Sequence, residues 1–325
     1  MPTASTKKLS CFVTGFWIFN LLAGFMVVAG LVLWSNPAVV AYFISPTPTA
    51  TETVTPSPTA SATLTPPPTI TPVPSETGTP TETPTETPTP RPYSEGPLTI
   101  GTSVQGRPLE VHRFGTGEIE RLIVAGMHGG GEYNTIQLAG ELIAYLAEHP
   151  EIVSPDVTLY ILRSLNPDGE ARAHTHLGRA NANGVDLNRN WDANWQATWP
   201  RTGCWTLTYV TGGKAPGSEP ETQALMAFIQ EHHFDGIINY HSAALGVFAG
   251  GLPPKDFSIR LAQAVAAVTT YRYPPIDTGC VYTGGFVDWA AERGIAALDV
   301  ELTDHTHTDF EMNLKVLHVF LHWRK

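Results

Sequence analysis

Hydrophobic residues follow two different patterns along this 325-residue chain. Residues 12–34 form one uncharged apolar run that is long enough to cross a bilayer as a helix. From residue 97 onward, short apolar runs typical of buried strands alternate with stretches in which apolar residues recur at helical spacing. Residues 45–96 lie between these regions and contain almost nothing apolar. The chain therefore divides into a membrane segment, a linker and one folded domain.

The folded region alternates predicted strands with predicted helices. Strands are expected at 121–126, 157–162, 236–241 and 295–301, and helices at 134–149, 220–233, 257–270, 285–293 and 309–322. Asn134 is expected to cap the first helix, and Ser218-Glu219-Pro220-Glu221 resembles a capping box at the second. Strands that alternate with helices predict βαβ units. The expected fold is α/β, with a mixed, mostly parallel sheet covered by helices on both faces.

The N-terminal apolar run is predicted to be an uncleaved signal anchor. Lys7 and Lys8 precede it and no basic residue follows it closely, which places residues 1–11 in the cytoplasm and the rest of the chain outside. The run is longer than the apolar part of most cleaved signal peptides; a cleaved, secreted form is the alternative. The Thr/Pro-rich segment 45–96 cannot pack and is expected to be a disordered, extended stalk.

Charge and cysteine content narrow the classes of partner. The net charge is −11 with no basic stripe, which argues against a nucleic-acid partner. Cys11 lies beside the apolar run, so Cys204 and Cys280 are one candidate disulfide if the domain is exported; two free thiols are the alternative. We expect the chain to be a monomer.

Two of the predicted strands lead into histidines. The run Leu122–Ala125 ends in a glycine-rich loop that carries His128 and Glu132, and the strand at 236–241 ends in His241. Open α/β sheets place their sites at the carboxyl ends of strands. Two histidines and a glutamate are a zinc ligand set of the catalytic kind. The alternative is that each histidine is a hydrogen-bonded structural residue.

Further candidates for chemistry follow along the chain. Arg179 and the motif Gly184–Asn190, GVDLNRN, offer donors that can hold a carboxylate and stabilise an oxyanion. Glu301 ends the last predicted strand, where a carboxylate can act as a general base. Each also has an ordinary explanation, namely surface arginines on a loop and a structural glutamate.

Taken in order, these motifs resemble the zinc carboxypeptidase family of metallopeptidases. The likeness extends over nearly all of residues 97–325 and rests on His128 with Glu132, Asn166-Pro167-Asp168-Gly169, Arg179, the motif at 184–190, Ser218–Thr222, His241-Ser242, Tyr282 before Asp288-Trp289, and Glu301. The resemblance implies an enzyme that removes C-terminal residues from peptides. It also implies one zinc ion, bound by His128, Glu132 and His241, with Asp186 orienting His128.

The resemblance assigns the remaining roles as well. Arg189 with Asn188 would bind the terminal carboxylate of the peptide, and Arg179 would stabilise the oxyanion. Glu301 would take a proton from the attacking water, which zinc activates, and pass it to the leaving amine. Tyr282 would cover the bound substrate.

Three features depart from the family pattern. The usual metal motif is His-x-x-Glu, whereas three glycines separate His128 from Glu132; a bulge in the permissive glycine backbone would absorb the extra residue. Tyr282 lies closer to the following Asp-Trp pair than usual, so Tyr273 is its alternative. Val287, just before that pair, indicates a preference for an apolar C-terminal residue.

Other functions fit the same residues. Within the fold, these are a peptidase for peptidoglycan stem peptides at the cell surface and an N-acyl amino acid deacylase. From a different class, an inactive surface binding module is suggested by the altered His-to-Glu spacing, but such a module has no need of Glu301, Arg179 and Arg189. The run 304–309, rich in His and Asp, is a candidate second metal site or simply a loop. Four tryptophans at 191–205 are candidates for a cleft lining or for loop packing.

Overall fold

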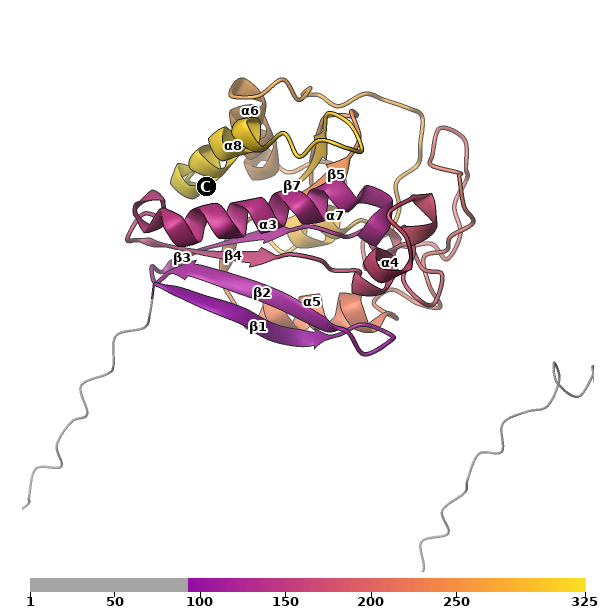
Figure 1. The fold of residues 1–325 in the computed structure, drawn as a ribbon. Coiled ribbons are helices and arrows are strands. Elements are labelled where there is room, and N and C mark those ends of the chain that lie inside the picture. The colour runs from indigo at the N-terminus through magenta and orange to yellow at the C-terminus, as the bar shows by residue number, and fades with distance from the viewer. Residues whose placement is uncertain (1–92) are drawn as a thin grey trace, which may run out of the picture. The chain divides into compact units, whose positions relative to one another are not determined.

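Residues 93–325, the part of the chain that the computed structural model describes, form a seven-stranded sheet with helices on both faces (Figure 1). The strand order is β1-β2-β4-β3-β5-β7-β6. The strands are β1 Ser94–Thr102, β2 Pro108–Gly115, β3 Ile119–Val124, β4 Val157–Leu162, β5 Phe234–Ser242, β6 Val247–Ala249 and β7 Ala296–Leu302. The helices are α3 Tyr133–Glu148, α4 Pro167–Arg172, α5 Pro220–Gln230, α6 Asp256–Ala267, α7 Phe286–Ala291 and α8 Phe310–His322.

The predicted N-terminal segments fall outside this region. The cytoplasmic segment 1–11, the membrane segment 12–34 and the linker up to residue 92 are not among the described residues. Strand β1 begins at Ser94, three residues before the domain boundary predicted at 97. Within residues 93–325, no helix combines the length and the apolar character that crossing a membrane requires.

The sheet is mixed, as expected, but it is not mostly parallel. The central pairs β4–β3, β3–β5 and β5–β7 are parallel, whereas β1–β2, β2–β4 and β6–β7 are antiparallel. Strands β1, β2 and β6 were missed, because they lie at or near the edges and show only a weak apolar alternation. The prediction holds for the buried centre of the sheet, where parallel strands give continuous apolar runs.

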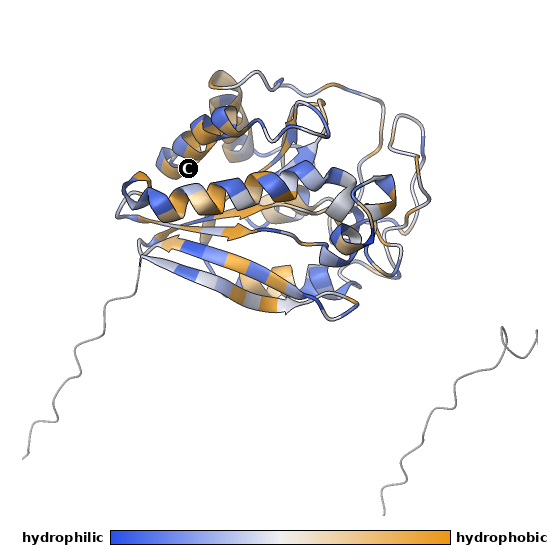
Figure 2. Ribbon diagram, in the orientation of Figure 1, coloured by the Kyte–Doolittle hydropathy of each residue, from blue (hydrophilic) through white to orange (hydrophobic). Residues whose placement is uncertain are grey.

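Two hydrophobic cores lie on the two faces of the sheet. Helices α3, α6 and α8 pack on one face, and α5 and α7 on the other (Figure 1). Along β3, Ile123 points into the first core while Leu122 and Val124 point into the second. Figure 2 shows apolar and polar residues alternating along α3. The apolar positions of this helix, such as Leu138 and Leu142, are fully buried, so burial of this face holds α3 on the sheet.

The predicted helix caps differ from those observed. Asn134 lies in the first turn of α3 and donates to the carbonyl oxygens of Asp304 and His307 instead of capping the helix. No side chain caps α5, because Glu219 accepts hydrogen bonds from Ser218 and from asparagines at 181 and 183. The predicted turn at 166–169 opens the short helix α4, in which the side chain of Asn166 accepts from the backbone of residue 169.

Candidate metal centre

The side chains of His128, Glu132 and His241 converge at the carboxyl ends of β3 and β5. Nδ1 of His128 lies 2.7 Å from one oxygen of Glu132, and Nδ1 of His241 lies 2.9 Å from the other. The two Nδ1 atoms are 3.2 Å apart. All three side chains are buried. These separations approach the distance of about 3.3 Å between ligand atoms around a tetrahedral zinc ion with bonds of about 2.0 Å.

The extra residue between His128 and Glu132 is absorbed by the 3₁₀ helix η1, Gly129–Glu132, instead of a bulge. Gly129 has a φ of +47°, a region that favours glycine. A Cβ at Gly130 would lie 1.8 Å from the carbonyl oxygen of Ala173. The glycines therefore allow η1 to pack closely on the segment that follows α4, and the turn directs Glu132 back to both histidines.

Asp186 and Arg179 support the metal centre from one side. Asp186 lies 3.0 Å from Nε2 of His128 and receives Nε of Arg179 at 3.0 Å. Arg179 also donates to Glu132 at 3.2 Å. Burial raises the pKa of Asp186, but Arg179 and His128 outweigh it and hold the pKa well below its ordinary value. Asp186 is thus a buried anion that fixes the ring of His128 with Nδ1 toward the metal centre.

A second carboxylate, which was missed among the sequence candidates, lies beside His241. Asp299 precedes Glu301 by two residues on β7, so both side chains point to the same face of the sheet as Asn239 and His241 on β5. One oxygen of Asp299 lies 3.4 Å from Nε2 of His241 and receives the amide of Asn239 at 2.7 Å. The signal was available in the spacing of Asp299 and Glu301 along one strand.

Burial lowers the pKa of His241, but the nearby carboxylates of Asp299 and Glu132 raise it well above its ordinary value. For Glu132 the balance has the opposite sign. Burial raises its pKa, and the two histidines hold the pKa well below the ordinary value. The centre therefore keeps an anionic ligand between two imidazoles.

Asn188 and Arg189 lie on the 3₁₀ helix η4, Leu187–Arg189, next to the metal centre. The amide nitrogen of Asn188 lies 3.1 Å from Nε2 of His241, and its oxygen accepts from the backbone of Phe286 at 2.9 Å. Arg189 is 7% exposed, donates to the carbonyl of Asn188 at 2.7 Å, and leaves its Nε buried without a hydrogen-bond partner. Within residues 93–325, Arg189 forms no ion pair.

Glu301 faces the same centre from the end of β7, directly across from His241 in the sheet register. Its Oε2 is buried without a hydrogen-bond partner. Burial raises its pKa to about 8, and the charge of Glu132 adds to the shift. An unpartnered carboxylate with a raised pKa is suited to accepting a proton from a reacting group.

The remaining candidates are placed differently. The ring of Tyr282 lies 5.3 Å from the guanidinium carbon of Arg189, whereas Tyr273 packs against the core formed with α3, α6 and α8. Val287 is 4% exposed and lies in the other core, so its side chain offers little surface to a substrate. In the run 304–309, Asp304 accepts hydrogen bonds from the residues that follow it and shapes a loop before α8.

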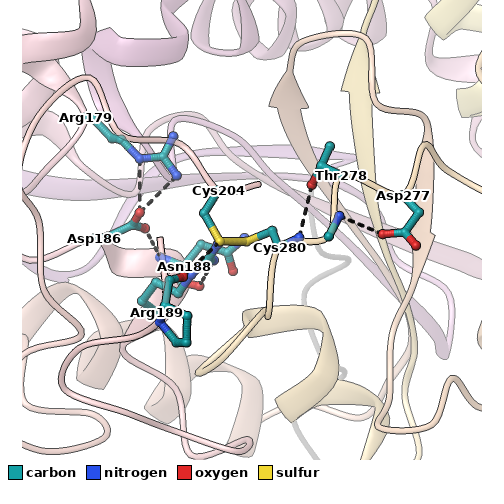
Figure 3. The surroundings of a disulfide bond; sticks show 10 residues. Arg179, Asp186, Asn188, Arg189, Cys204, Asp277, Thr278 and Cys280 are labelled. Atoms are coloured by element: carbon teal, nitrogen blue, oxygen red, sulfur yellow. Dashed lines mark hydrogen bonds and ion pairs between the residues drawn. A yellow bond between two sulfur atoms is a disulfide. The ribbon is translucent and has the colours of Figure 1, made fainter. Parts of the chain in front are cut away.

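The long connection between η4 and α5 carries Cys204, which forms a disulfide with Cys280. Figure 3 shows this bond together with Arg189 and with the Arg179–Asp186 pair. Of the four tryptophans, Trp191 is fully buried in the core under α7, while Trp199 packs within the connection itself. Packing, one of the two expected uses of the tryptophans, is therefore seen for Trp191 and Trp199.

Comparison with known proteins decides the family. A family model described as zinc carboxypeptidase matches residues 96–318. The chain belongs to the zinc carboxypeptidase family. Bovine carboxypeptidase A1 is 30% identical over 234 residues, which cover 61% of this chain and 54% of that protein. The chain thus spans about half the length of the carboxypeptidase A relatives that it matches.

A bacterial relative and two solved structures extend the comparison. Murein peptide amidase A of Escherichia coli K12 is 34% identical over 223 residues, covering 64% of this chain and 82% of that protein. The crystal structure of murein-tripeptide amidase from Escherichia coli O157 has a TM-score of 0.50 at 27% identity and covers 72% of this chain and 94% of that one. Bovine thrombin-activatable fibrinolysis inhibitor shares the fold, with a TM-score of 0.54, 18% identity and coverage of 69% and 86%.

The zinc carboxypeptidase family uses one zinc ion, and the donors present fit it. His128, Glu132 and His241 are the only group of three or more such ligands found within residues 93–325. Two imidazole nitrogens and one carboxylate are the donor types of catalytic zinc. Each histidine turns Nδ1 toward the centre. Nε2 of His128 contacts Asp186 at 3.0 Å, as is usual for metal-binding imidazoles, whereas Nε2 of His241 lies 2.7 Å from the amide nitrogen of Asn239 and 3.4 Å from Asp299. The chain accordingly combines the zinc carboxypeptidase family fold with a donor set that can hold zinc.

Asp299→Asn is expected to weaken zinc binding by roughly 10-fold or more, because a neutral amide holds Nε2 of His241 less firmly than a carboxylate. Asp186→Asn should weaken it further, since its contact to His128 is 3.0 Å compared with 3.4 Å for Asp299. Titration against a chelator of known affinity measures both. Zinc affinity unchanged in Asp299→Asn would show that this aspartate does not hold the histidine.

A stability prediction concerns Asp288 on α7. Burial raises its pKa from 3.8 to about 6, so the unfolded chain ionises first and the folded protein loses stability as the pH rises between these values. Asp288→Asn removes that loss. The free energy of unfolding of the variant, relative to that of the wild type, should increase between pH 3.8 and about pH 6 by at most about 3 kcal/mol, and then level off. Urea unfolding at a series of pH values measures it, and a difference that does not change with pH would contradict the prediction.

Proposed function

We propose that this chain is a metallocarboxypeptidase that hydrolyses the C-terminal peptide bond of substrates with a free carboxyl terminus. One observation carries the proposal: Arg189, adjacent in sequence to a residue that touches His241, is buried, has an unpartnered Nε and forms no ion pair among the described residues. A buried cation without an anion is costly, and a ligand carboxylate would relieve that cost.

The surroundings of Arg189 support this role. Burial lowers the pKa of Arg189. The carboxylates of Asp186 and Asp299 raise it, although neither lies within ion-pair distance of the guanidinium. A guanidinium keeps its charge in proteins, so the site offers an ionised donor to a substrate anion. Asn188 points its amide toward His241, which leaves Arg189 as the principal group for the carboxylate. An amidated C-terminus would lack the charge that Arg189 requires.

The other residues of the centre supply the remaining parts of a hydrolysis. Zinc, when bound by His128, Glu132 and His241, would polarise the scissile carbonyl and make the attacking water more acidic. Glu301 would accept the proton of that water at its unpartnered oxygen and deliver it to the leaving amine. Arg179, which already reaches Glu132, would stabilise the developing oxyanion. Tyr282 would close over the substrate beside Arg189.

A cell-wall peptide is a second candidate substrate. The observation that favours it is the match to murein peptide amidase A, which extends over 82% of that protein, a larger share than for carboxypeptidase A1. Peptidoglycan peptides also end in a free carboxylate, so Arg189 could bind the terminal carboxylate of either substrate. An inactive binding module is less well supported. The unusual His-to-Glu spacing suggested it, but Glu132 contacts both histidines despite the extra residue.

We also propose that the catalytic domain works outside the cytoplasm, tethered by the apolar segment 12–34 or secreted after its cleavage. The disulfide between Cys204 and Cys280 supports this, since such bonds persist in oxidising compartments. Fractionation of cells that express the full chain, with protease added to intact cells, tests the location. Protection of the domain from the protease would contradict it.

The experiment for substrate class uses the purified full-length chain loaded with zinc. It is incubated with α-linked peptides, with γ-linked peptidoglycan stem peptides and with N-acyl amino acids, and products are read by mass spectrometry with and without a chelator. We expect the loss of single C-terminal residues, and we expect the chelator to stop it. The kind of substrate that is cleaved fastest identifies the substrate class. Cleavage of N-acyl amino acids alone would replace the proposal with a deacylase, and no cleavage at all would contradict an enzyme.

A further inference from the structure

Three aromatic rings lie against the two arginines of the site. The ring of Trp205 lies 4.5 Å from the guanidinium carbon of Arg179, and the rings of Trp199 and Tyr282 each lie 5.3 Å from that of Arg189. We call Trp199, Trp205 and Tyr282 the aromatic cap. A guanidinium in contact with an aromatic ring can still donate hydrogen bonds through its N–H groups. The cap can therefore restrain each arginine without occupying the groups that would meet a substrate.

The edges of the two guanidiniums are in fact used differently. Arg179 donates along its edge to Asp186 and Glu132, so its orientation toward the metal centre is fixed by hydrogen bonds as well as by Trp205. Within residues 93–325, the side chain of Arg189 donates only to the carbonyl of Asn188. The rings of Trp199 and Tyr282 are thus the main restraint on Arg189 in the absence of a ligand.

The cap comes from two segments that are far apart in the sequence. Trp199 and Trp205 lie in the connection 190–219, which contains no helix or strand, and Tyr282 lies before α7. The disulfide Cys204–Cys280 joins them, with one cysteine adjacent to Trp205 and the other two residues before Tyr282. Figure 3 shows Asn188 and Arg189 among the residues that surround the bond.

Close packing supports the same junction. A Cβ at Gly203 would lie 2.0 Å from the carbonyl oxygen of Thr278, so the backbones of the two segments are in direct contact next to the disulfide. Trp199 is buried with Ala180 and Val210, and Cys204 and Trp205 pack against this small cluster. The connection is therefore held by a core of its own and by one covalent bond, although it lacks regular structure.

We propose that the aromatic cap, fastened by the disulfide, is a positioning device with two separable parts: Trp199 holds Arg189 for binding the terminal carboxylate, and Trp205 holds Arg179 for the transition state. The roles of the arginines rest on the proposed function, whereas the cap itself rests on the contacts above. Loss of the Trp199 contact should weaken ground-state binding, and loss of the Trp205 contact should slow the chemical step.

Steady-state kinetics of the zinc-loaded full chain test the proposal with a peptide that the wild type hydrolyses. Trp199→Leu should raise KM by roughly 3- to 30-fold with kcat nearly unchanged, and Trp205→Leu should lower kcat by a similar factor with KM nearly unchanged. Trp205→Phe should recover most of the loss because a ring is restored. Since Trp199 is buried, Trp199→Phe serves as a second variant with a smaller rise in KM.

A matched control is available away from the site. The ring of Trp323 lies 6.0 Å from the guanidinium carbon of Arg121 in the layer of α8, so Trp323→Leu removes a similar contact without touching the centre. It should change neither KM nor kcat. The double variant Cys204→Ser with Cys280→Ser should show both effects together; substitution is preferred to thiol reductants, which bind zinc.

Two further readouts separate this proposal from the proposed function. Zinc content should equal that of the wild type in every cap variant. The affinity for an N-acetyl amino acid, measured by equilibrium binding, should fall in Trp199→Leu and Trp199→Phe but not in Trp205→Leu. Equal changes of KM and kcat in both tryptophan variants, or changes in Trp323→Leu as well, would overturn the cap as a positioning device. A wild type that trims no peptide would overturn the function, and the binding measurement would then decide on the cap by itself.

Discussion

Replacement of Glu301 by glutamine is expected to lower kcat by roughly 10²- to 10⁴-fold, the usual effect of losing a general base. Glutamine keeps the size of the side chain but cannot take a proton. The buried, unpartnered oxygen of Glu301 is the only group of the described centre that combines a carboxylate with a pKa raised to about 8. Steady-state kinetics and metal analysis measure the result, with zinc content expected to stay unchanged.

The pH dependence of the wild type provides a check on this assignment. In the metal-free protein, burial and Glu132 raise the pKa of Glu301 to about 8. A divalent cation bound nearby favours the ionised carboxylate and should move this pKa downward, toward neutral pH. Activity should therefore rise with pH through an ionisation below about 8.

A Glu301→Gln variant that retains more than a tenth of the wild-type kcat would exclude Glu301 as the base.

Replacement of Arg189 by glutamine is expected to reduce kcat/KM for free-acid peptides on the order of 10²-fold, mainly through KM. The guanidinium is the one buried cation near the centre that lacks an anionic partner within residues 93–325, so its loss removes the charge that would hold a C-terminal carboxylate. The measurement is the dependence of initial rate on peptide concentration. Arg260→Gln, on the exposed side of α6, is the matched control and should behave as the wild type.

If Arg189→Gln reduced kcat/KM for amidated peptides by the same factor, Arg189 would not bind the terminal carboxylate specifically. Such a result would instead indicate that Arg189 supports the centre as a whole. The contacts argue against that outcome, because Arg189 makes one hydrogen bond, to a neighbouring backbone carbonyl, and otherwise contacts aromatic rings.

The sequence predicted the centre of the fold well because buried parallel strands leave a strong signal. The strand β4 is almost wholly apolar, β3, β5 and β7 each contain a short apolar run, and α3, α6 and α8 show a clear apolar face. The edge strands β1 and β6, and β2 next to β1, were not predicted, since they carry mixed polar and apolar residues. Helix caps were misplaced because the polar residues concerned bond to distant parts of the chain.

The candidate site divides in the same way. His128, Glu132, His241 and Glu301 follow apolar strands, so the sequence places them at one edge of a sheet. Asp299 was overlooked although its spacing from Glu301 places both on one face of a strand, because its contact with His241 depends on the register between β5 and β7. The disulfide Cys204–Cys280 was one of two alternatives in the sequence, and the structure shows that it forms. The contacts of the aromatic cap with Arg179 and Arg189 were not predicted, because they depend on how an irregular connection packs.

The proposed carboxypeptidase activity depends most directly on the binding of a free carboxylate by Arg189. The decisive measurement is therefore the hydrolysis of one peptide, prepared as free acid and as C-terminal amide, by the zinc-loaded full chain and by Arg189→Gln. The wild type should cleave the free acid on the order of 10²-fold more efficiently than the amide, and Arg189→Gln should lose most of that preference. Equal cleavage of the two peptides by the wild type would contradict the proposed carboxypeptidase.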